Sequence, residues 1–191
     1  PLFFSKENFS NGCIATVDVT YPSAPLYLLT APALLKGMLI PILDYAETGR
    51  WKFPFAPHDL GTYPLANGQV YGGGERTDDN QMPVEECGNM LLLPGALVEF
   101  GGDLDFARRY RETRKLWDDY LLDKGYDPEN QLCTDDFGGH LAHNTNLSLK
   151  AILALGAWAA VEKKLGNAAE SKKYRAAAEE AAKRWKNGAC D

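Results

Sequence analysis

Two kinds of predicted helix alternate along this chain, and this alternation constrains the fold more than any other feature. Residues 83–100 and 144–165 are apolar on almost every side, which is typical of helices buried all round. Residues 103–123 and 168–186 carry an apolar stripe against charged residues, which is typical of helices that cover a core. A short glycine turn follows each buried helix. The sequence therefore predicts an all-α protein built from helical hairpins.

A further apolar segment precedes these hairpins. Tyr21 to Pro25 leads into one predicted helix of about twenty residues, ending near Gly49, which Pro41 is expected to kink. Residues 1–23 are turn-rich, and we expect an irregular lead-in there. The whole chain, 191 residues, has the length of one domain with a single core.

The hairpin pattern repeats. The segment from Gly102 to Arg111 aligns with the segment from Gly166 to Arg175, each at the start of an amphipathic helix. Inner and outer helices repeated in this way are typical of toroids and solenoids. Chance similarity between two amphipathic helices is the alternative.

Two long connections, 50–82 and 124–143, lead into the first turns of the buried helices. In antiparallel hairpins the short turns lie at one end and the long loops at the other. We therefore expect both loops and the lead-in to gather on one face, with all three histidines of the chain. The acids and histidines of that face are Asp18, His58, Asp59, Asp78, Asp79, Glu85, Glu86, Asp135, Asp136, His140 and His143.

Glu85 and Glu86 are the most prominent candidates, because they open the buried helix that starts at Pro83. Neighbours on a helix point about 100° apart, so only one of them is expected to face the centre while the other caps or pairs elsewhere. Paired carboxylates suit general acid and base catalysis. The alternative is that both only stabilise the helix N-terminus. His58-Asp59 is a weaker signal of the same kind.

The other candidates have equally plain structural interpretations. His140 and His143 could reach a metal together with Asp135 or Asp136, but a hydrogen-bonding role within the loop is the favoured interpretation. Cys87 could be a nucleophile if a histidine lay within reach, whereas a small buried cysteine is the more common case.

Composition excludes several classes. The net charge of -6 and the lack of a basic stripe argue against a nucleic-acid partner. The longest apolar run, 25–43, is interrupted by Lys36 and prolines, so no membrane span is predicted. Four cysteines without a CxxC pair argue against structural zinc and leave the redox compartment open. We expect no metal and no cofactor. No signal peptide is visible, and the opening at Pro1 suggests a processed or trimmed start.

Four motifs resemble the large helical domain of the bacterial and fungal glutaminase A-like proteins. They are DVTYPSAPLYLL (18–29), APHDLGTYPLANG (56–68), MPVEECGNM (82–90) and GGHLAHNTNLSLKAI (138–152). The resemblance covers nearly the whole chain in the same order. It implies a six-hairpin (α/α) toroid like those of many glycoside hydrolases, of which this chain is about half. It also implies two partners, the rest of the ring and a β-rich N-terminal domain, and a secreted or periplasmic location.

The resemblance implies a hydrolase that converts glutamine to glutamate and ammonia. A glycoside hydrolase with a pair of carboxylates and a non-catalytic carbohydrate-binding domain are the alternatives, so the small-molecule substrate is an amino acid or a saccharide. The catalytic candidates are Asp18, Asp59, Glu85, Glu86 and Asp136. The candidates for substrate contact are His58, Asn89, Asp135, His140, His143, Asn144 and Asn146.

Overall fold

The computed structural model describes residues 2–134 and 136–188, and of Asp136 it describes only the backbone. Within these residues the chain is helical and its only β pairings are isolated bridges, so the predicted all-α class is confirmed. The helices are α1 (Val17–Thr30), α2 (Pro32–Ala46), α3 (Pro83–Gly101), α4 (Leu104–Arg109), α5 (Arg111–Lys124), the 3-10 turn η1 (Asp136–Gly138), α6 (Thr145–Lys164) and α7 (Ala168–Gly188).

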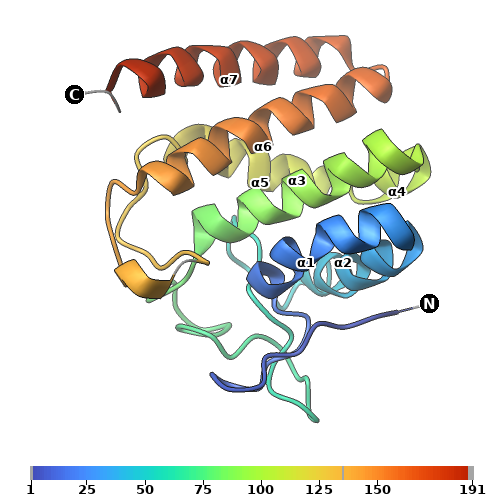
Figure 1. Ribbon diagram of the computed structural model, residues 1–191, viewed down its shortest axis with the longest axis vertical. Coiled ribbons are helices and arrows are strands. Elements are labelled where there is room, and N and C mark those ends of the chain that lie inside the picture. Colours follow the sequence, from blue (N-terminus) through green and yellow to red (C-terminus); the bar gives the residue numbers. More distant parts are fainter. Residues whose placement is uncertain (1, 135, 189–191) are drawn as a thin grey trace.

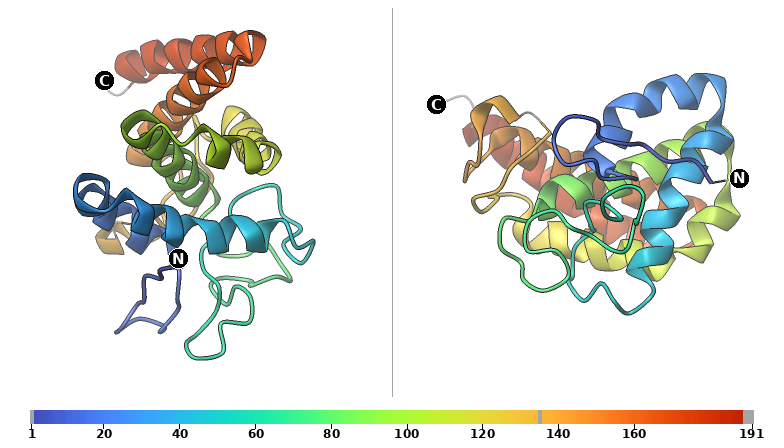
Figure 2. Two further views of the ribbon diagram at one scale, coloured as in Figure 1. Left: turned by 90° about the vertical axis from the view of Figure 1, so that its right-hand side faces the viewer. Right: turned by 90° about the horizontal axis from the view of Figure 1, so that it is seen from below.

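The helices form three successive hairpins. α1 packs on α2, α3 on α5, and α6 on α7, while α3 lies between α1 and α6 and packs against both. Figures 1 and 2 show the hairpins stacked in chain order. The core lies where α3 and α6 meet the helices around them, and its largest fully buried side chains include Trp117 and Trp158. None of the described helices combines the length and the apolar character that crossing a membrane requires.

The first hairpin corrects the sequence interpretation. The single helix expected to end near Gly49 is two helices, which meet at Ala31 (φ −155°, ψ 69°). Ala31 precedes Pro32, and the proline ring disfavours α-helical geometry in the residue before it. The irregular lead-in also ends earlier than predicted, because α1 begins at Val17.

The other helices lie close to their predicted bounds, with one interruption. α3, α6 and α7 match, and Gly102 ends α3 in the left-handed region at φ +68°. The helix expected over 103–123 is broken at Tyr110 into α4 and α5. Asp103 caps α4 by accepting a hydrogen bond from the Phe106 amide.

The sequence repeat reappears in side-chain contacts. Tyr110 and Tyr174, which align in the repeat, are both buried. The Tyr110 hydroxyl donates to Asp44 on α2 at 2.7 Å, and the Tyr174 hydroxyl donates to Asp119 on α5 at 2.7 Å. Each tyrosine thus ties its helix to the second helix of the preceding hairpin. The second and third hairpins therefore contact the preceding hairpin in the same way.

The lead-in and the long loops contact one another around the first turn of α3. A bridge between Cys13 and Thr62 joins the lead-in to the loop before α3. Gln131, on the loop before α6, accepts a hydrogen bond from the Val84 amide at 2.9 Å. Stacked and edge-to-face rings order the loop before α3, as between Trp51 and Phe55. The loop ends of the hairpins therefore meet at Glu85 and Glu86.

Candidate functional site

A cluster of acids lies at the loop ends of α1 and α3. We call Asp18, His58, Asp59, Glu85, Glu86 and Asn89 the carboxylate centre. Asp18 lies in the first turn of α1, and both glutamates lie in the first turn of α3. Proline at the first position of α3 and acids in its first turn suit a helix N-terminus. All of the centre is buried except Asp18, whose side chain is 14% exposed.

Glu85 is held by three donors. Its Oε1 accepts hydrogen bonds from Lys150 Nζ, from Thr134 Oγ1 at 2.6 Å and from Asn89 Nδ2 at 3.0 Å. Lys150 also donates to Asn89 Oδ1 at 2.9 Å, and its ammonium lies 4.3 Å from the centroid of the Tyr21 ring. The charge of Glu85 is therefore balanced by a buried cation from α6.

Glu86 has far fewer partners. Its Oε2 accepts one hydrogen bond, from Asn89 Nδ2 at 3.0 Å, while its buried Oε1 has no hydrogen-bond partner among the described residues. That oxygen lies 4.0 Å from His58 Nε2. Burial, reinforced by the negative charges of Asp18 and Glu85, raises the pKa of Glu86 well above its usual value.

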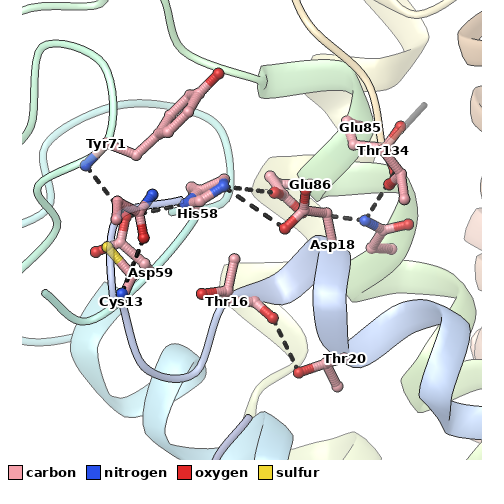
Figure 3. A network of polar contacts seen from close by, with 12 residues as sticks. Cys13, Thr16, Asp18, Thr20, His58, Asp59, Tyr71, Glu85, Glu86 and Thr134 are labelled. Carbon is pink, nitrogen blue, oxygen red and sulfur yellow. Dashed lines mark hydrogen bonds and ion pairs between the residues drawn. The ribbon is translucent and has the colours of Figure 1, made fainter. Parts of the chain in front are cut away.

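His58 lies between the acids of three segments (Figure 3). Its Nδ1 is 2.9 Å from Asp59 Oδ2, and its Nε2 is 3.6 Å from Asp18 Oδ1 and 4.0 Å from Glu86 Oε1. The ring stacks on Tyr71 with centroids 4.1 Å apart. The imidazole is thus held on one side and presents Nε2 to two carboxyl groups.

Asp59 fixes the orientation of His58. Its oxygens accept hydrogen bonds from the amides of Gly61 at 2.7 Å, Val70 at 3.2 Å and Tyr71 at 3.2 Å. Burial acts to raise the pKa of Asp59, but the contact with His58 and these amides outweighs it, and the pKa lies below the usual value. Because Asp59 is an ionised acceptor, the Nδ1 of His58 carries a proton.

The structure brings six of the predicted residues together, and the others have different surroundings. His143 is exposed and pairs with Asp127 at 2.6 Å. Asn144 caps α6 by accepting from the amides of Asn146 and Leu147. His140 and Asn146 are exposed. Asp135 and the side chain of Asp136 lie outside the described residues, so their predicted roles stay predictions.

Cys87 has the environment of a structural cysteine. It is fully buried, its Sγ accepts a hydrogen bond from the Ala56 amide at 3.3 Å, and burial raises its pKa. A nucleophilic cysteine needs the opposite shift. Cys13, Cys87 and Cys133, the cysteines that the structure describes, form no disulfide.

Sequence reasoning missed two members of this neighbourhood. Lys150 was visible as a lone cation in the apolar body of α6, and Gly88 leaves room for it, since a Cβ there would lie 2.6 Å from Lys150 Cγ. Glu7 carried no such signal. One ligand atom each from Glu7, Asp18 and His58 lies within 4.8 Å of the others, a grouping that could hold a metal ion.

A pocket of about 300 Å³ lies elsewhere, between the C-terminal halves of α3 and α6. Its lining is mostly apolar and includes Leu92, Phe100 and Ala157. None of its lining residues belongs to the carboxylate centre, so the polar chemistry and this apolar groove are separate features.

The whole chain, residues 1–191, matches the model of the glutaminase A six helical-hairpin domain. The chain belongs to this family. The all-helical content of the described residues agrees with such a domain, and the match confirms the resemblance seen in the motifs around Asp18, His58 and Glu86.

Two relatives support the assignment. The chain is 39% identical over 186 residues to a protein named Glutaminase A from Aspergillus oryzae, with 97% of this chain and 26% of the relative covered. It is 31% identical to a protein named Probable glutaminase from Arthroderma benhamiae, with 92% of this chain and 26% of that relative covered. The chain therefore spans about a quarter of the length of either relative.

Proposed function

We propose that the carboxylate centre is part of the active site of a glutaminase-like hydrolase that converts glutamine to glutamate and ammonia. The names of the relatives support the reaction. The observation that carries the proposal is the position of His58, which presents Nε2 to Asp18 and Glu86 where α1 and α3 begin. Such groups, when they converge, can position a water and transfer its proton.

We assign proton transfer to Glu86. It takes a proton from the attacking water, whose oxygen bonds to the amide carbon, and returns a proton to the nitrogen as the carbon–nitrogen bond breaks. Asp18 and His58 hold this water on the side opposite Glu86. Glu85 has a positioning role, because Lys150 and Thr134 already occupy its Oε1.

A glycoside hydrolase is the second candidate. Asp18 and Glu86 come from two helices and approach the same nitrogen of His58, so two carboxyl groups flank one point. Two flanking carboxyl groups are the usual machinery for cleaving a glycosidic bond. In this reaction Glu86 would act as the acid and Asp18 as the base or nucleophile.

We propose further that the other hairpins of the longer protein complete a ring and cover the apolar groove between α3 and α6. The family domain has six hairpins, and the described residues of this chain form three. The added hairpins would cover exposed apolar side chains such as Phe100 and Leu29.

A dye that binds apolar surface should bind the isolated 1–191 segment more strongly, per mole, than the longer protein. Equal binding would contradict this proposal.

The test of the reaction uses the full-length protein and the variant Glu86→Gln. We expect ammonia release from L-glutamine to fall by about 10²–10⁴-fold, the usual contribution of a proton-transferring side chain. Glu179→Gln, an exposed change on α7, is the matched control and should keep full activity. Wild-type-like ammonia release by Glu86→Gln would contradict the proposal. Cleavage of aryl glycosides without ammonia release would favour the second candidate.

A further inference from the structure

Three ligand-type side chains converge beside Glu86. Glu7 comes from the lead-in, Asp18 from α1 and His58 from the loop before α3, and their ligand atoms lie within 4.8 Å of one another. Ligands bound to one transition-metal ion at 2.0–2.2 Å from it lie about 3–4.4 Å apart. The spacing therefore needs only a small contraction to enclose an ion.

The imidazole is already prepared for coordination. Metal-binding histidines commonly donate their second ring N–H to a carboxylate, which fixes the tautomer and aims the other nitrogen. Asp59 Oδ2 is the acceptor for the Nδ1 proton of His58 at 2.9 Å, and three backbone amides donate to Asp59 in turn. Stacking on Tyr71 fixes the plane of the ring. Nε2 thus presents its lone pair toward Asp18 and Glu86.

A second observation points to a bound cation. Glu86 is fully buried, and its Oε1 lies near His58 Nε2 without a hydrogen-bond partner among the described residues. Glu7 Oε2 is likewise buried without such a partner. Buried carboxylate oxygens that make no hydrogen bond are costly, and a cation held by Glu7, Asp18 and His58, with Glu86 beside His58, would reduce that cost.

We propose that Glu7, Asp18 and His58 bind one divalent transition-metal ion, Zn²⁺ or Mn²⁺, with Glu86 beside it. One imidazole nitrogen and two carboxylates suit these ions, whereas Ca²⁺ and Mg²⁺ prefer all-oxygen shells. Three protein ligands leave coordination positions for water. The site departs from our sequence-based expectation of no metal, because Glu7 carried no signal in the sequence.

The claim that an ion binds here does not depend on what the ion does. That role, holding and activating the attacking water, rests on the proposed hydrolase function. Glu7 separates the two proposals, since it belongs to the metal site and has no part in the proton transfer assigned to Glu86.

The experiment measures metal binding by the full-length protein after dialysis against a chelator. ZnCl₂ or MnCl₂ is titrated calorimetrically, and metal content is then measured by mass spectrometry. We expect Glu7→Gln to bind one ion fewer per chain, or to bind that ion at least 10-fold more weakly, while Glu179→Gln matches the wild type. The melting temperature of wild type should rise with the ion, and that of Glu7→Gln should rise less.

Two results would overturn the metal site. One is Glu7→Gln binding both ions as the wild type does, and the other is wild-type protein binding neither. If these occur while Glu86→Gln still abolishes ammonia release, the metal site fails and the proposed function stands. If Glu7→Gln loses the ion while Glu86→Gln keeps full activity, the metal site stands and the proposed function fails.

Discussion

Glu85 and Glu86 are neighbours on one helical turn, and both are fully buried, yet their surroundings are opposite. Glu85 faces a lysine, a threonine hydroxyl and an amide. Glu86 shares only that amide and directs its other oxygen toward His58 and Asp18. Asn89 joins the two by donating to both through the same nitrogen.

The difference teaches that burial alone does not identify a functional acid. Glu85 Oε1 is paired with Lys150 and accepts two further hydrogen bonds, which makes its burial tolerable, although its Oε2 has no hydrogen-bond partner among the described residues. Among the described residues Glu86 forms no salt bridge with a lysine or arginine, and its pKa is raised well above the usual value; strongly shifted pKa values are concentrated at functional sites. We therefore expect the Lys150 side of the centre to serve stability, and we propose that the His58 side serves chemistry.

The largest expected effect comes from removing the orientation of His58. Asp59→Asn replaces the ionised acceptor of the Nδ1 proton and favours the other tautomer. We expect the ammonia-releasing activity of the full-length protein to fall by about 10²–10⁴-fold, as when an orienting carboxylate is lost elsewhere. Steady-state kinetics measure the change, and circular dichroism checks the fold. Unchanged kinetics in a folded variant would show that His58 needs no orientation.

The second prediction acts on the structural side. Lys150→Met removes the cation that balances Glu85 and leaves a buried charge without its partner. The expected loss is about 3–5 kcal/mol in the free energy of unfolding, measured by urea denaturation. The double variant Lys150→Met with Glu85→Gln should recover part of it. If the single variant lost less than about 1 kcal/mol in the free energy of unfolding, Lys150 would not stabilise the fold by balancing Glu85.

The smallest effect concerns a third buried acid, Asp118 on α5. Asp118 lies outside the carboxylate centre, so it shows what burial alone does to an acid that has no proposed part in the chemistry. Burial raises the pKa of Asp118 to about 9, and neither oxygen has a hydrogen-bond partner among the described residues. An unfolded aspartate ionises near pH 4, so the folded state loses stability as pH rises from about 4 to 9.

Asp118→Asn should therefore stabilise the protein by about 1–2 kcal/mol at pH 8 and by almost nothing at pH 4. Thermal melts across this pH range give the measurement. The activity at pH 8 should not change. A stabilisation that is the same at both pH values would show that the raised pKa is not the cause.

The sequence predicted the hairpins because apolar and amphipathic helices alternate, a signal carried by many residues at once. It missed the break at Ala31, since the apolar pattern runs on across it and only Pro32 marks the turn. Helix geometry predicted that only one of Glu85 and Glu86 would face the centre while the other capped or paired elsewhere, and the roles of both stay proposals. Their partners could not be predicted, because Lys150 meets Glu85 across two packed helices, and the position of Glu7 depends on how the lead-in folds back through the bridge between Lys6 and Ile14.

The central claim is that Glu85 holds the structure and Glu86 performs the chemistry. The most direct test compares Glu85→Gln and Glu86→Gln in the full-length protein, with melting temperature and ammonia release measured on the same samples. The account predicts a lower melting temperature for Glu85→Gln, and an unchanged or higher one with lost activity for Glu86→Gln. A fully active Glu86→Gln, together with an inactive Glu85→Gln of wild-type stability, would contradict it.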